Sequence, residues 1–273
     1  MTADAQRMIE ILVSREPAMR SAADIGREMQ GRVPVEMKSH TGNLMADVVT
    51  EADRRVQQEI LTVLAPTDLR RCTLLAEETP SGEDPRGAFE GSAGLYLTID
   101  PIDGTKRFTE GKPWFSLIVG LHDGRRPLYT FAYYPRLDWW IRMAGDAAET
   151  SGPPLDLGID ASKVIVYTTG DPRTDVPGRA AALERAGYRF QVGEQVSECG
   201  SKYLFLSGLA AGYYSGNPNL YDGLFGLHYA LCHGLALEAR GRDGGPMDLT
   251  QHEPSKWGLR YPGYYIVLPP GIT

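Results

Sequence analysis

One six-residue run, with the sequence DPIDGT, carries residue types that can bind a metal ion and a phosphate together. Asp100 and Asp103 flank a tight turn after an apolar strand, so their carboxylates and the Ile102 carbonyl can converge on a hard cation such as Mg²⁺. Gly104 and Thr105 then offer backbone N–H groups and a hydroxyl for a phosphate beside that cation. Asp-Pro and Asp-Gly pairs also occur in ordinary turns. Whether this run is a metal site or a plain turn must therefore be judged from the rest of the chain.

Composition describes an ordinary globular protein. The chain has 273 residues, 42% of them hydrophobic, which is enough for one large domain or two packed subdomains. Its formal net charge of -7 argues against coating a nucleic-acid polymer. No apolar run approaches a membrane span and the N-terminus lacks a signal peptide, so we expect a cytoplasmic protein that binds no membrane. Three widely spaced cysteines fit neither a disulfide framework nor a zinc site.

The elements that must position the DPIDGT run can be predicted from hydrophobic periodicity. A helix is expected up to about Met29 and a second from Thr50, as the capping residue, to Leu64. Short apolar runs then predict strands at residues 74–75, 95–99, 115–121 and 130–134, the last followed by a turn and a strand up to Met143. The loop 79–92, rich in glycine, proline and acidic residues, is expected to be mobile.

A polar break at residues 151–154 marks the predicted boundary between two subdomains. We therefore divide the chain into an N-terminal α+β metal-binding part, 1–152, and a C-terminal α/β part, 153–273, that completes the active site. In the second part the pattern predicts strands at 163–168 and 263–268 and helices at 178–186, 204–212 and 222–237.

Acidic residues recur at the ends of these predicted elements. They are Asp53 in the first turn of a helix, Glu77 after a strand, Asp100 and Asp103 at the turn, and Asp222 at the start of a late helix. An acidic residue at a helix start is ordinary, because it suits the helix dipole. One such residue is therefore weak evidence for a site, but the five together form a pattern.

Three segments, Glu77-Glu78, the DPIDGT run and Tyr221-Asp222, resemble the signatures of the inositol monophosphatase superfamily of Mg²⁺-dependent, lithium-sensitive phosphatases. Further matches in the same order are Lys38, the segment 47–53 and the Cys-Gly-Ser-Lys segment 199–202. The resemblance covers nearly the whole chain and is specific for membership, but not for substrate. It implies an α/β fold, a layered αβαβα sandwich of the sugar phosphatase kind.

The resemblance also implies a role for each site residue. The ligands of two or three Mg²⁺ ions would be Glu77, Asp100, the Ile102 carbonyl, Asp103 and Asp222. Glu77 and Thr105 would orient and help deprotonate a water activated by Mg²⁺, and Asp53 would hold a further ion through water. That water would attack phosphorus in line without a phosphoenzyme. Inhibition by lithium is expected on the same grounds.

Substrate contacts follow from the resemblance less directly. The residues expected to contact the substrate are Asp103, Gly104, Thr105, Gly200, Ser201, Lys202 and Ser215. Lys202 is expected either to reach a second anionic group or to lie solvated on the surface. Ser215 stands where inositol phosphatases carry an acidic residue that binds substrate hydroxyls, which argues against inositol monophosphate. Leu224 and Phe225 add bulk where the family has small residues.

We therefore predict a Mg²⁺-dependent phosphomonoesterase that hydrolyses a small phosphorylated metabolite: a sugar, cyclitol or nucleotide phosphate. One alternative is a 3′-nucleotidase acting on 3′-phosphoadenosine 5′-phosphate. Another is a non-catalytic protein that binds metal and phosphate, although every acidic ligand and Thr105 are present. The oligomeric state stays open, with a homodimer among the arrangements considered.

Overall fold

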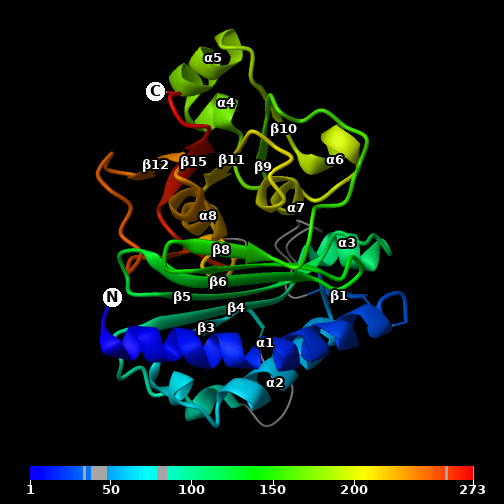
Figure 1. Ribbon diagram of the computed structural model, residues 1–273, viewed down its shortest axis with the longest axis vertical. Coiled ribbons are helices and arrows are strands. Elements are labelled where there is room, and N and C mark those ends of the chain that lie inside the picture. Colours follow the sequence, from blue (N-terminus) through cyan, green and yellow to red (C-terminus); the bar gives the residue numbers. More distant parts are fainter. Residues whose placement is uncertain (33–34, 38–47, 79–84, 256–257, 273) are drawn as a thin grey trace.

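Five layers make up the molecule, in the order helices, sheet, helices, sheet, helices (Figure 1). The computed structural model describes residues 1–32, 35–37, 48–78, 85–255 and 258–272. Lys38, Asp47 and the side chains of 48–50, including the predicted cap Thr50, lie outside what it describes, as does part of the loop expected to be mobile, 79–84. The mixed α/β class and the layered order predicted from the sequence are confirmed.

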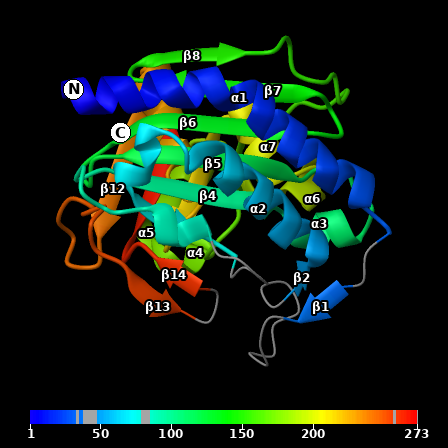
Figure 2. The same cartoon turned by 90° about the horizontal axis from the view of Figure 1, so that it is seen from below.

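The first layer consists of α1 (Ala3–Met29) and α2 (Glu51–Leu64), which cross one face of a six-stranded sheet (Figure 2). Their apolar faces bury Leu12, Met19, Val56 and Ile60 against that sheet. Removing such side chains from water is the main stabilising contribution of this interface. The sequence predicted both helices nearly to the residue.

The six-stranded sheet has the order β3-β4-β5-β6-β7-β8. The bounds of its strands are Thr73–Ala76, Tyr96–Asp103, Ser116–His122, Pro127–Tyr134, Trp139–Ala144 and Ala147–Thr150. β3 pairs with β4 in parallel, and the remaining pairs are antiparallel. The carboxyl ends of β3 and β4 therefore meet at one edge, where Glu77 follows β3 and Asp100 to Asp103 end β4.

The second sheet has the order β10-β9-β11-β15-β12. Its strands are Arg189–Gln191, Val164–Tyr167, Gly212–Gly216, Gly263–Leu268 and Ala236–Gly241. Helices α7 (Ser201–Leu206) and α8 (Phe225–His233) lie between the sheets, and α4 (Pro172–Asp175) and α5 (Pro177–Arg185) cover the outer face (Figure 1). Within the described residues, no helix is both long and apolar enough to cross a lipid bilayer.

Smaller elements complete the chain. They are β1 (Val35–Met37), β2 (Val48–Thr50), α3 (Thr105–Thr109), α6 (Gly193–Ser197), β13 (Glu253–Ser255), β14 (Gly258–Arg260) and the 3₁₀ helices Asp68–Arg71 and Pro85–Ala88. One apolar cluster joins Tyr134 and Ile141 of the first sheet to Phe205 and Tyr265 of the second half. The division at residue 152 stays a prediction, and this shared core means that each half buries part of its surface on the other.

Two predicted helices are wrong in extent. The helix expected at 204–212 is α7, which begins earlier, at Ser201, and ends at Leu206, because Gly208 adopts a left-handed φ of 74°. The helix expected at 222–237 is α8, which begins only at Phe225 and ends at His233, because the next residue, Gly234, has a left-handed φ of 60°. Asp222 therefore lies in the turn before α8, and the chain after Gly234 forms β12 instead.

Candidate active site

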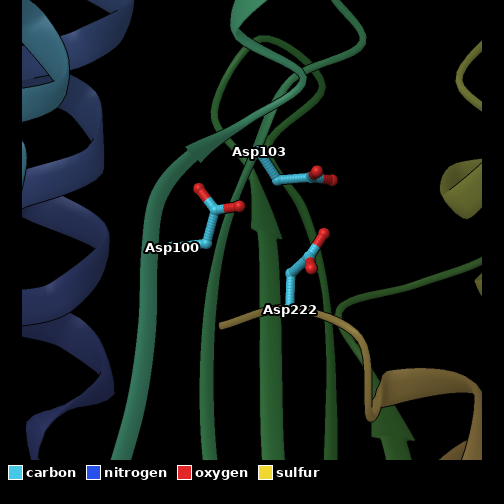
Figure 3. Close-up of side chains that lie close together, drawn as sticks. All are labelled: Asp100, Asp103 and Asp222. Atoms are coloured by element: carbon cyan, nitrogen blue, oxygen red, sulfur yellow. The ribbon is translucent and has the colours of Figure 1, made fainter. Parts of the chain in front are cut away.

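A bulge in β4 brings two carboxylates to the same side of the strand. Asp100 lies opposite Ile118 of β5 and Asp103 lies opposite Ser116, so β4 contains one more residue than β5 over this stretch. In a regular strand, residues three apart point to opposite faces. The extra residue reverses that alternation, and Figure 3 shows both side chains in the same region as that of Asp222. Pro101 suits this position because it has no N–H to donate to the ladder.

Asp222 reaches the same place from the other half of the chain. It lies in a turn closed by a hydrogen bond from the Gly223 N–H to the Asn219 carbonyl, at 2.9 Å. A Cβ on Gly223 would lie 2.2 Å from that carbonyl oxygen, so this turn needs glycine. One carboxylate oxygen from each of Asp100, Asp103 and Asp222 lies within 4.8 Å of the other two (Figure 3).

The ammonium of Lys202 lies between two of these carboxylates. Its Nζ is 2.5 Å from Asp103 Oδ1 and also pairs with Asp222 Oδ2. Lys202 is the second residue of α7 and its side chain is only 10% exposed, so the expectation of a solvated surface lysine is wrong. Its Nζ also lies 5.6 Å from the ring centroid of Phe225, which with Leu224 is buried beside the site.

The site holds mutually repelling charges out of water. Burial raises the pKa of Asp100 well above its ordinary value, and the carboxylates of Glu77 and Asp103 raise it further. Burial also raises the pKa of Asp103, against the opposing effect of Lys202. For Lys202, burial alone would lower the pKa, but Asp103 and Asp222 outweigh it and raise the pKa well above its ordinary value. The charged cluster therefore needs cations.

The donor set fits Mg²⁺. Among the residues that the structure describes, the buried Oδ1 of Asp100 has no hydrogen-bond partner, which is costly for a carboxylate unless a cation binds it. Glu77 and Ile102 line the same cavity, and the carboxylates and the Ile102 carbonyl are hard oxygen donors of the kind that Mg²⁺ prefers. The five predicted ligands are thus brought to one cavity, while the number of ions stays a prediction.

Thr105 and Asp53 meet beside the cluster. The Thr105 hydroxyl, at the start of α3, lies 3.1 Å from the Ile102 carbonyl oxygen and 3.4 Å from Asp53 Oδ1. Asp53 is completely buried in the first turns of α2. α2 and β4 pack directly against one another, and this contact places a residue predicted from a distant helix next to the DPIDGT run.

Gly104 makes the sharp transition from β4 to α3. Its φ is 86°, and a Cβ there would lie 3.1 Å from the Trp114 carbonyl oxygen. Both the left-handed backbone and the close approach exclude larger residues. Gly104 and Thr105 consequently line a cavity of about 340 Å³ together with the carboxylates. A cavity of this size suits a small metabolite.

Gly200, Ser201 and Ser215 lie near this cavity with different contacts. The Ser201 hydroxyl accepts from the Gly193 N–H at 2.8 Å and donates to the Tyr167 carbonyl at 2.9 Å, so it ties α7 to β9. The buried Ser215 hydroxyl lies 2.8 Å from Thr169 Oγ1. Ser215 and Lys202 line one small hollow next to the carboxylates, and Gly200 and Ser201 line another. Their substrate contacts stay predictions.

Sequence reasoning missed several residues of the cavity wall. They are Lys106, Arg107, Thr168, Thr169, Gly170, Asn219 and Arg260. Lys106 and Arg107 directly follow the DPIDGT run, so their position in sequence could have drawn attention to them. Arg107 also pairs with Glu194 of α6. Arg260 comes from β14 and is joined to Asn219 by an isolated bridge, a placement that only the fold reveals.

Two sheets joined through central helices, with a buried carboxylate cluster at the bulged end of one strand, define a metal-dependent phosphohydrolase site. The chain belongs to the inositol monophosphatase family: the model of the "Inositol monophosphatase family" matches residues 12–222. It is a Mg²⁺-dependent phosphatase, a phosphoric monoester hydrolase.

Relatives within the family differ in what their names say they act on. The chain is 27% identical over 241 residues to the 3′(2′),5′-bisphosphate nucleotidase CysQ of Shigella flexneri, covering 86% of this chain and 92% of that protein. It is 27% identical over 198 residues to inositol monophosphatase 3 of Solanum lycopersicum, covering 71% of each. The fold matches that of an IMPase/NADP phosphatase complexed with Mg²⁺ and phosphate, with a TM-score of 0.64, 18% identity and coverage of 97% and 92%.

Proposed function

We propose that this chain hydrolyses a small sugar, cyclitol or nucleotide phosphomonoester with Mg²⁺ held by the carboxylate cluster. The observation that carries the proposal is the buried, unpartnered Oδ1 of Asp100 within a three-carboxylate cluster at the floor of an open cavity. The fold shared with an IMPase/NADP phosphatase complexed with Mg²⁺ and phosphate supports the choice of this metal and of a phosphorylated substrate.

Mg²⁺ would be held by Glu77, Asp100 and the Ile102 carbonyl, with Asp103 and Asp222 on the far side of the cluster. When bound there it supplies positive charge that stabilises the phosphate oxygens and makes water more acidic. Phosphoryl transfer depends on such charge and on positioning, because the protein itself has little covalent chemistry to do. The remaining requirements are a site that orients the attacking water and groups that hold the phosphate.

Thr105 supplies the orientation in this proposal. Its hydroxyl donates to the Ile102 carbonyl or to Asp53, so its lone pairs face away from those acceptors and can accept from a water. Glu77 lines the same cavity and offers a carboxylate to receive the proton of that water. Gly104 and Thr105 line the cavity, and their backbone N–H groups would donate to a phosphate oxygen.

Release of inorganic phosphate tests this function. We expect the wild-type protein to release phosphate from at least one member of a panel of phosphomonoesters in Mg²⁺, and to release none after chelation and dialysis. Addition of Mg²⁺ to the dialysed protein should restore the rate. A folded protein that binds Mg²⁺ and phosphate but turns over no member of the panel would favour the non-catalytic alternative.

A second candidate is a nucleotidase for a nucleoside bisphosphate such as 3′-phosphoadenosine 5′-phosphate. Three cationic residues, Lys106, Arg107 and Arg260, line the cavity around the carboxylates, and such groups attract a second phosphate. The coverage of the CysQ relative supports the same candidate. It predicts that kcat/KM for 3′-phosphoadenosine 5′-phosphate exceeds kcat/KM for adenosine 5′-monophosphate by at least tenfold, and equal values would contradict it.

A further inference from the structure

Lys202 differs from the other cavity cations because it lies inside the carboxylate cluster rather than around it. Its Nζ contacts Asp103 Oδ1 at 2.5 Å and Asp222 Oδ2, and its side chain is 10% exposed. Within the described part of the chain, no third carboxylate forms an ion pair with it. α7 and the Phe225 ring hold the side chain in this position.

The ammonium occupies the space in which an ion bridging Asp103 and Asp222 would lie. A Mg²⁺ ion binds carboxylate oxygens at roughly 2.0–2.1 Å, only a little closer than the 2.5 Å between Nζ and Asp103 Oδ1. Two cations cannot share that space, because they would overlap and repel one another in a buried site of low dielectric. Lys202 also supplies positive charge to the same two carboxylates that such an ion would neutralise.

The third carboxylate of the cluster, Asp100, has a different environment. Asp100 is not paired with Lys202, and its Oδ1 is buried without a hydrogen-bond partner among the described residues. Glu77 and the Ile102 backbone lie on the cavity wall with Asp100. The Asp100 carboxylate is therefore left for a Mg²⁺ ion that Lys202 does not replace.

We propose that Lys202 is a built-in cation that takes the place of the divalent ion between Asp103 and Asp222, so that the chain works with one Mg²⁺ fewer than its carboxylates would otherwise hold. This inference rests on the proposed function. Lys202 acts here as a positioning residue for Asp103 and Asp222. The inference does not require Lys202 to contact the substrate. Removing its charge should open a second divalent site rather than simply weaken the first.

Metal stoichiometry tests the inference without using activity. Isothermal titration of the metal-free protein with Mg²⁺, and with Mn²⁺ followed by electron paramagnetic resonance, counts the ions bound per chain. We expect Lys202→Ala to bind one ion more than the wild type. Lys202→Met should bind this additional ion more weakly, because its side chain is longer than that of alanine and still fills part of the space. Lys112→Met is the matched control, since Lys112 is an exposed lysine paired with Glu198. It should bind as many ions as the wild type.

Equal stoichiometry in the wild type and Lys202→Ala, with phosphate release intact in the wild type, would overturn the inference and leave the proposed function standing. A wild type that binds no Mg²⁺ and releases no phosphate would instead contradict the proposed function.

A second measurement uses only the wild type and so does not depend on whether a variant folds. Reductive methylation followed by mass spectrometry reports which lysines are accessible. We expect Lys202 to stay unmodified both without and with saturating Mg²⁺, whereas Lys106, whose side chain is 44% exposed, is modified in both. Modification of Lys202 that rises on adding Mg²⁺ would mean that the ion displaces the ammonium, and this would overturn the inference.

Discussion

The hydroxyl of Thr105 has two acceptors within reach and one proton to donate. The Ile102 carbonyl is the nearer acceptor at 3.1 Å, and Asp53 Oδ1 lies at 3.4 Å. Because both acceptors belong to elements that build the site, the rotation of this hydroxyl is set by the fold rather than by a substrate. A group fixed in this way before substrate arrives can orient a water at little entropic cost.

Replacement of this hydroxyl should therefore affect turnover more than binding. We expect Thr105→Ala to lower kcat by about two orders of magnitude with a smaller change in KM. Thr105→Ser, which keeps the hydroxyl, should retain most of the activity. Thr109→Ala is the control for a threonine lost from the same helix, since its hydroxyl donates to the Lys106 carbonyl. Near-normal kcat in Thr105→Ala would remove this hydroxyl from the mechanism.

The carboxylates of the cluster differ in their partners, because Asp222 pairs with Lys202 and Asp100 does not. Replacing each of these two by asparagine should therefore have different effects on stability. We expect Asp100→Asn to abolish Mg²⁺-dependent hydrolysis, because it removes a charged ligand of the ion. Asp222→Asn should also lower hydrolysis strongly, because it leaves the buried Lys202 ammonium with Asp103 as its one carboxylate partner among the described residues. Without metal, Asp100→Asn should raise Tm, since it removes a buried charge that repels Glu77 and Asp103. Asp222→Asn should show no such gain, because it takes one of two carboxylates from Lys202.

Calorimetry of both variants in chelator, with and without added Mg²⁺, checks this difference in Tm. Normal specific activity in a folded Asp100→Asn protein would contradict the assignment of that residue as a ligand. Equal gains in Tm for both variants would show that Lys202 does not stabilise Asp222.

The acidic residues of the site could be predicted from the sequence, but the position of the Lys202 ammonium between them could not. Asp100, Asp103 and Thr105 are adjacent in sequence, so a short motif is enough to place them together. Lys202 lies 99 residues from Asp103, and a lysine side chain on a six-residue helix can point inward or outward. Only the packing of α7 between the sheets decides that direction.

Among the elements, α8 shows how the central layer is attached to the first sheet. His228 is completely buried on α8, with its Nδ1 2.9 Å from Thr130 Oγ1 and its Nε2 2.9 Å from the Gly145 carbonyl oxygen. A carbonyl only accepts, so Nε2 carries the proton and Nδ1 accepts from the threonine hydroxyl. His228 is therefore a core residue, and it holds the helix that follows Asp222.

This histidine should make stability depend on pH. Burial lowers the pKa of His228 from 6.5 to about 4, so its contribution is fully present above pH 6.5 and is lost as the pH falls toward 4. At pH 5 protonation of the unfolded chain costs the native state about 2 kcal/mol. The measurement is the free energy of unfolding in urea at pH 7.5 and at pH 5. We expect its decrease between these pH values to be about 2 kcal/mol smaller in His228→Gln than in the wild type.

His233→Gln is the matched control, since it removes an exposed histidine from the end of the same helix. Its unfolding free energy should follow that of the wild type across this pH range. A His228→Gln protein with the same pH dependence as the wild type would show that the buried imidazole contributes nothing to the pH response.

The ends of α7 and α8 explain why elements were predicted less well after residue 200. Helical and strand patterns overlap in short apolar runs such as 204–214, where most residues are buried and no polar face marks the period. Gly208 and Gly234 end the helices through left-handed φ values that a sequence leaves undetermined, because glycine is also tolerated within helices. In α1 and α2 one face is exposed, so the helical period is visible and both bounds were predicted closely.

On the scale of the whole molecule, the cavity is built by both halves of the chain. Glu77 and the DPIDGT run come from the first sheet, whereas Thr168 to Gly170, Asn219, Asp222 and Arg260 come from the second half. The first half supplies most of the residues proposed to perform the chemistry. The second half supplies most of the wall that a leaving group would touch, so substrate preference should depend on it.

Ser215 on β11 makes that preference testable. It is buried beside Thr169, and a serine offers a substrate hydroxyl no charged acceptor. The resemblance to inositol phosphatases implies an acidic residue at this position in those enzymes. A missing partner for one substrate hydroxyl costs about 1–3 kcal/mol, or roughly ten- to hundredfold in kcat/KM. We expect inositol 1-phosphate to be a poorer substrate by this factor than the best of fructose 1,6-bisphosphate, 3′-phosphoadenosine 5′-phosphate and a nucleoside 5′-monophosphate. Measurement of kcat/KM for all four decides it. If inositol 1-phosphate is the best of them, another residue of the cavity wall must bind its hydroxyls.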